Sequence, residues 1–74
     1  MEMIYDVQQI FVERLKDLMA DKKLNIQKLS NNIKIPSSTI SDWLNKKTTP
    51  NMYNIVKMAL FFEVSTDYLL GLEN

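Results

Sequence analysis

The chain has 74 residues, no cysteine and no histidine, and its nine basic and nine acidic residues give a formal net charge of zero at pH 7. A chain of this length forms one small domain, which buries only about 60% of the surface that is exposed on unfolding. The composition excludes disulfides, and the lack of imidazole excludes the usual zinc and catalytic histidine sites. No apolar run approaches the roughly 20 residues of a membrane span, and the start is not a basic signal peptide. We therefore expect a soluble cytoplasmic domain that contacts no membrane and needs neither a metal nor a cofactor.

The charges are unevenly distributed along the chain. Residues 22–57 carry seven lysines and one acidic residue, whereas residues 1–21 and 58–74 each carry a net charge of −3. A basic centre between acidic ends produces a polarised field, which orients a protein on a phosphate backbone. This pattern favours a nucleic-acid partner, and the alternative is that the lysines are ordinary solvated surface residues.

The sequence predicts an all-helical protein, because it has one glycine, two prolines and no stretch of alternating polar and apolar residues. Asp6 and Gln9 resemble a capping box, which opens a first helix that runs to about residue 21. Asn25 is a good cap for a second helix, which ends near residue 32 and is followed by a turn. Pro36 suits the first positions of a third helix, which ends near residue 45.

A polar loop over residues 46–50 leads to the fourth helix, which Asn51 caps and which ends near residue 62. Ser65 caps a short fifth helix over residues 66–70, and Gly71 is placed to end it in the left-handed conformation. Helical spacing on the fourth helix places five apolar residues inward: Met52, Ile55, Val56, Ala59 and Phe62. We expect a single domain over residues 1–74, with an N-terminal extension over 1–12 and a core over 13–71.

The second and third helices are the most informative part of the chain. Leu29 and Ile33 lie four residues apart and form an apolar stripe on the second helix. Ile40 and Trp43 do the same on the third helix, so we expect Trp43 in the core and not stacked on a base. Ile35 lies between the two stripes and would plug the turn. Two short helices joined in this way, the second with a polar outer face, are typical of a helix-turn-helix that enters a DNA groove.

Several short motifs occur in a characteristic order and spacing: Arg14-Leu15-Lys16, Leu29-Ser30, Ser38-Thr39-Ile40-Ser41 followed by Trp43 and Asn45, Lys47 with Pro50, and VSTDYLLG at residues 64–71. Through these motifs the chain resembles the lambda-repressor/Cro-type helix-turn-helix family, also called the XRE family. The resemblance implies a five-helix fold that binds operator DNA, usually as a two-fold dimer, with the third helix in the major groove. We therefore expect a sequence-specific transcriptional regulator, of the phage-repressor type.

The resemblance also implies which residues contact DNA. The positions that read base edges are Ser37, Ser38, Ser41 and Asp42. The positions that grip phosphates are Asn25, Lys28, Asn45 and Lys47, and two further lysines, Lys34 and Lys46, add charge beside them. For the residues of the third helix, the alternative is that the serines at its start merely cap it and that its carboxylate is a solvated surface charge.

Four departures from the family pattern qualify this assignment. Ile26 replaces a glutamine that often holds a phosphate. Lys34 replaces the usual turn glycine and has to accept a positive φ, and Lys46 likewise replaces a glycine. Many relatives pair an arginine with a glutamate where this chain has Met19 and Leu44, so we predict that these two apolar side chains touch.

A second surface is predicted near the C-terminus. We expect an apolar patch that serves as a homodimer interface and contains Leu60, Phe61, Leu69 and Leu72. The alternative is a wider core in which residues 1–10 pack against the fourth helix. The competing function is a protein-interaction module on the same fold, such as an antitoxin or antirepressor, with a protein partner or a C-terminal effector domain. An enzyme is not expected, because the carboxylates are scattered and no nucleophile–base pair appears.

Overall fold

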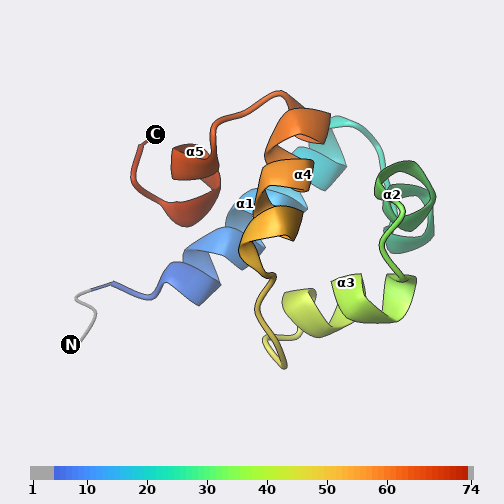
Figure 1. Ribbon diagram of the computed structural model, residues 1–74, viewed down its shortest axis with the longest axis horizontal. Helices are drawn as coiled ribbons and strands as arrows, with labels where there is room; N and C mark the ends of the chain where they lie inside the picture. Colours follow the sequence, from blue (N-terminus) through green and yellow to red (C-terminus); the bar gives the residue numbers. More distant parts are fainter. Residues whose placement is uncertain (1–4, 74) are drawn as a thin grey trace.

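The computed structural model describes residues 5–73, and this part of the chain folds into five helices without a β-strand (Figure 1). The helices are, in chain order, α1 (Val7–Asp21), α2 (Ile26–Ile33), α3 (Ser37–Leu44), α4 (Met52–Phe62) and α5 (Thr66–Leu70). The all-helical prediction is confirmed, and the predicted bounds agree to within one residue. Residues 1–4 of the predicted N-terminal extension lie outside the described residues. No helix between residues 5 and 73 is both long and apolar enough to cross a membrane.

The starts of the helices are fixed by side-chain caps in the first residue before the helix. At α1, α2, α4 and α5 the cap oxygen accepts a backbone N–H three residues on, and these caps are Asp6, Asn25, Asn51 and Ser65, as predicted. The helix α3 differs, because Pro36 precedes it and no side chain caps its free N–H groups. The capping box at α1 is half formed, since the Gln9 amide donates to the Glu13 carboxylate at 3.0 Å instead of reaching back to the cap.

Each helix is followed by a residue in the left-handed conformation, which ends the helix. These residues are Lys23, Lys34, Lys46, Glu63 and Gly71, with φ between +56° and +83°. The prediction of positive φ at Lys34 is confirmed, and so is that at Gly71; Lys23 and Glu63 were not predicted. An L-residue in this conformation costs about 1–2 kcal/mol. The hydrogen bonds that the conformation permits, such as Lys47 N–H to Asp42 O at 2.9 Å after α3, satisfy carbonyls at the helix ends.

The core lies between α1 and α4, with α2 and α3 on one side of this pair and α5 on the other (Figure 1). Every helix contributes at least one buried apolar side chain. Trp43 is only 2% exposed and meets the ring of Phe11 edge-on, with the ring centroids 6.3 Å apart, so its predicted place in the core is confirmed. This contact seats α3 on α1.

The prediction for α4 is wrong at two positions. Met52 is 73% exposed and Val56 is 48% exposed, whereas Met58 is fully buried in their place. The buried set on this helix is Ile55, Met58, Ala59 and Phe62. Because α4 is apolar almost all round, two different stripes satisfy helical spacing, and only packing against other helices, among them α2 and α5, selects one.

The C-terminal residues are fastened to α1 by Arg14. Its Nη1 donates to the carbonyl oxygens of Tyr68 and Glu73, both at 2.7 Å. Its guanidinium also lies 4.3 Å from the centroid of the Tyr68 ring, in a cation–π contact. These contacts hold α5 and the residues after it against the side of α1.

Candidate nucleic-acid interface

The turn between α2 and α3 is held by a few short-range contacts. The hydroxyl of Ser30 donates to the carbonyl of Ile35 at 2.6 Å, and the N–H of Lys34 donates to the carbonyl of Ser30 at 2.9 Å. Ile35 is 5% exposed, so its predicted role as a plug is confirmed. The turn thus fixes α3 relative to α2 while the polar face of α3 remains on the surface.

The four predicted base-reading residues lie together on the outer side of α3. Ser38 is exposed, and Ser37, Ser41 and Asp42 are half-buried. Ser37 lies four residues before Ser41, and Ser38 lies four residues before Asp42, so each pair forms a stripe on this side of the helix. No serine hydroxyl caps α3, so the hydroxyl groups at its start are not committed to the backbone there. This observation counts against the interpretation that they serve only as caps.

Two of the predicted phosphate-binding residues are engaged within the protein. The amide nitrogen of Asn45 donates to the carbonyl of Ser41 at 2.9 Å and to its hydroxyl at 3.3 Å. Asn45 would therefore exchange these bonds for any contact with a phosphate. Asn25 accepts the N–H of Lys28 at 2.8 Å through its side-chain oxygen, so capping of α2 orients it.

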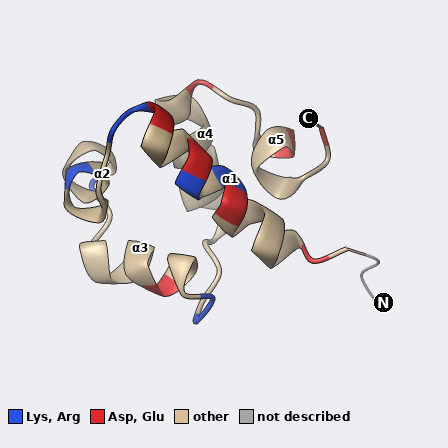
Figure 2. Ribbon diagram, turned by 180° about the vertical axis from the view of Figure 1, so that it is seen from behind, with Lys and Arg blue, Asp and Glu red and all other residues tan. Residues whose placement is uncertain are grey.

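The predicted lysines surround α3 on two sides. Lys28, Lys34, Lys46 and Lys47 are all exposed. Figure 2 shows basic residues on α2 and on the loop after α3, while most acidic residues lie on α1 and beyond α4. The basic and acidic segments of the sequence therefore also lie in different parts of the folded molecule, with the lysines near α3 and most acidic residues away from it.

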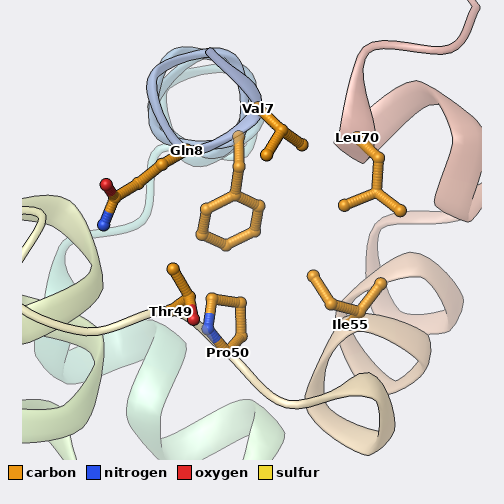
Figure 3. A pocket seen from close by; sticks show the side chains of 7 residues that line it. Val7, Gln8, Thr49, Pro50, Ile55 and Leu70 are labelled. Atoms are coloured by element: carbon orange, nitrogen blue, oxygen red, sulfur yellow. The ribbon is translucent and has the colours of Figure 1, made fainter. Parts of the chain in front are cut away.

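The loop after α3 makes one contact that sequence reasoning missed. The side-chain amide of Gln8, at the start of α1, donates to the carbonyl of Lys46 at 3.3 Å. The two residues are 38 positions apart, and no motif in the sequence pairs them. Beside this contact lies a small apolar pocket, lined by Val7, Gln8, Phe11, Thr49, Pro50, Ile55 and Leu70 (Figure 3).

One of the four residues predicted to form the dimer patch is not on the surface. Leu69 is fully buried and cannot belong to a surface patch, because Leu69, and not its neighbour Leu70, takes the deepest core position on α5. Leu60 and Leu72 are 75% and 62% exposed. Phe61 is half-buried and packs edge-on against Phe62. Exposed Met52, Tyr53 and Val56 extend the apolar surface of α4 from Leu60 toward its start.

Two further expectations concern the interior and metal binding. Met19 is buried, and Leu44 packs against the same core cluster, so both face inward as expected, while their direct contact stays a prediction.

Between residues 5 and 73, no group of three or more acidic side chains is arranged to hold a metal ion.

The arrangement of α2, turn and α3, with a buried α3 inner face and a polar outer face, defines a helix-turn-helix protein. Residues 12–74 match the sequence profile of the family described as "Helix-turn-helix domain". The chain belongs to this family, and the resemblance to the lambda-repressor/Cro type is confirmed.

A relative in Bacillus subtilis (strain 168) carries the name "Uncharacterized HTH-type transcriptional regulator YobD". It is 30% identical to this chain over 63 residues, which cover 85% of the chain and 56% of the relative. The chain thus spans about half the length of this relative. No solved structure matches the chain with statistical significance.

Proposed function

We propose that the protein is a sequence-specific DNA-binding transcriptional regulator that places α3 in the major groove. The observation that supports this most is the exposed polar face of α3 flanked by lysines, on a helix-turn-helix scaffold. An α-helix fits the major groove, and its outward side chains then reach the base edges. The relative's name points to the same class of protein.

The chemistry of α3 predicts soft base discrimination. Serine hydroxyls donate and accept, so Ser37, Ser38 and Ser41 tolerate several bases. Asp42 accepts from a cytosine amino group and is repelled by phosphates and by purine acceptors. Because α3 has neither arginine nor glutamine, no bidentate purine contact is available, and DNA shape and bridging water carry part of the specificity.

Phosphate contacts supply most of the affinity in this proposal. Lys28 and Lys34 approach one strand from the α2 side, and Lys46 and Lys47 approach the backbone from the loop after α3. Each neutralised phosphate adds about −0.9 to the slope of log affinity against log salt concentration. Binding is therefore expected to weaken steeply as salt rises.

We further propose that the protein acts as a phage-type repressor and binds as a two-fold dimer. The outer face of α4 supplies the contact surface, because Met52, Val56 and Leu60 follow one another at helical spacing and are all exposed. Leu72 and the partly exposed Phe61 extend it. A dimer places two copies of α3 about one turn of DNA apart, so the operator is expected to be a two-fold symmetric site.

Selection of duplexes from a random library with the purified protein tests the proposal. Enrichment of a two-fold symmetric motif supports a DNA-reading dimer, and Lys46→Ala/Lys47→Ala serves as a matched control that weakens binding to all sequences. Failure to enrich any motif at low salt contradicts the proposal. The function would then be that of a protein-interaction module, which the exposed apolar face of α4 favours as the alternative.

A further inference from the structure

The first turn of α1 reaches across the molecule to the basic loop after α3, which we define as residues 46–50. The contact is the hydrogen bond from the Gln8 amide to the carbonyl of Lys46, at 3.3 Å. Residues 7–11 of α1 precede residues 12–74, which match the family, so this contact comes from a part of the chain outside the family pattern.

The basic loop is fixed to α3 only at its beginning. Lys46 has φ +61°, and its N–H donates to Trp43 O at 3.1 Å. The N–H of Lys47 donates to Asp42 O at 2.9 Å. These bonds set the direction in which the chain leaves α3. The carbonyl of Lys46 belongs to the peptide between the two lysines, and its partner is supplied by Gln8 on another helix.

Apolar packing between α1 and the basic loop is too sparse to hold the loop without the hydrogen bond from Gln8 to Lys46. A pocket of about 110 Å³ lies among Val7 and Phe11 of α1 and Thr49 and Pro50 of the loop. Figure 3 shows Gln8 on the Thr49 side of this pocket, opposite Ile55 and Leu70. Side chains that face an open pocket lose dispersion contacts on that side, so apolar packing holds the loop weakly here. The hydrogen bond starts from Gln8, one of the residues that line the pocket, and links α1 to the loop directly.

We propose that Gln8 is a positioning residue, which holds the peptide between Lys46 and Lys47 so that both lysines are oriented toward the DNA backbone before binding. This inference rests on the proposed DNA-binding function. A loop that is ordered in advance loses less conformational entropy on binding, so affinity rises without a new contact to DNA. Gln8 itself touches no phosphate in this scheme.

Gln8→Ala tests the proposal, with Gln9→Ala as the matched control. Gln9 is the next residue on the same helix, and its amide donates to Glu13 and not to the loop. Gln8→Ala is expected to weaken DNA binding by about two- to tenfold, the range that a net hydrogen-bond free energy of about 0.5–1.5 kcal/mol implies. Gln9→Ala is expected to bind as the wild type does. Thermal unfolding of both variants shows whether the fold is intact.

A double-mutant cycle separates positioning from general destabilisation. In the Lys46→Ala/Lys47→Ala background, Gln8→Ala is expected to have no further effect on affinity, because the side chains that it orients are gone. The free protein supplies an independent readout, since the amide signals of Lys46 and Lys47 in NMR spectra are expected to shift and exchange faster in Gln8→Ala alone.

The outcomes distinguish this proposal from the proposed function. If the wild type binds DNA and loses affinity on removal of the two lysines, while Gln8→Ala changes neither affinity nor the amide signals, the positioning role is overturned and the function stands. An equal effect of Gln8→Ala in both backgrounds also overturns it. If the wild type binds no DNA, the function fails, and altered amide signals in Gln8→Ala still show that Gln8 holds the loop.

Discussion

Replacing Gly71 by alanine tests how closely the end of α5 is packed against α1. Gly71 has φ +83°, within the left-handed region that L-residues rarely adopt. A Cβ added at this position lies 2.9 Å from Cγ2 and 3.1 Å from Cδ1 of Ile10. The variant therefore meets two separate penalties, one in the backbone conformation and one in packing against α1.

The magnitude follows from these two penalties. The left-handed conformation costs an L-residue about 1–2 kcal/mol, and the smaller entropy that alanine loses on folding offsets about 0.5–1 kcal/mol of this. Ile10 is half-buried, so its packing penalty is taken at the low end of overpacking, about 1 kcal/mol. The free energy of unfolding is expected to fall by about 1.5–2 kcal/mol in total, which lowers Tm by roughly 6–16 °C in a domain of this size.

Guanidinium unfolding followed by far-UV circular dichroism measures this change, and a second background separates the two penalties. In Ile10→Ala the clash disappears, so Gly71→Ala is expected to cost only the backbone share, about 0.5–1 kcal/mol. An equal cost in both backgrounds would show that Ile10 does not crowd this position. A Gly71→Ala variant as stable as the wild type would refute both parts of the reasoning.

Four further outcomes are expected. Glu63→Gly should raise the free energy of unfolding by about 0.5–1 kcal/mol, because Glu63 also has a positive φ; a lower Tm in thermal unfolding would contradict this. Lys46→Ala/Lys47→Ala should flatten the slope of log affinity against log salt by about two, and an unchanged slope would mean that the lysines do not face DNA. Asp42→Ala should alter the preferred base at one position of the selected site, and an identical site would exclude Asp42 as a reader. Leu60→Glu should shift sedimentation toward the monomer while the far-UV circular dichroism spectrum stays that of the folded protein; an unchanged oligomeric state would place the interface elsewhere.

Local features of the sequence predicted most of the fold. A polar residue directly before an apolar repeat locates a helix start, so the caps at Asp6, Asn25, Asn51 and Ser65 were found without any knowledge of tertiary contacts. The burial of Trp43 followed in the same way, from its spacing to Ile40 on a helix with a clearly polar opposite face.

Features that depend on packing between distant segments were not predicted. The sequence of α4 permits two apolar stripes, so nothing local favoured Met58 over Met52 as a core residue. On α5, Leu69 and Leu70 are adjacent, and only contact with α1 and α4 decides which of them is buried. The contact between Gln8 and Lys46 spans 38 residues and joins two segments with no shared pattern. The residues on the surface of α2 and α3 that would contact DNA were therefore predictable from the sequence. The contacts between distant segments that hold these helices and the loop after α3 in place were not.

Trp43 gives the protein an internal spectroscopic probe. It is the single tryptophan of the chain, it belongs to α3, and it is enclosed against Phe11 of α1. Its fluorescence therefore depends on how α3 is seated on the core, whereas circular dichroism depends on the helical content of the whole chain. A movement of α3 that leaves every helix intact would change the emission wavelength and leave the dichroism unchanged. Displacement of the helix-turn-helix can thus be followed in the unlabelled protein, separately from unfolding.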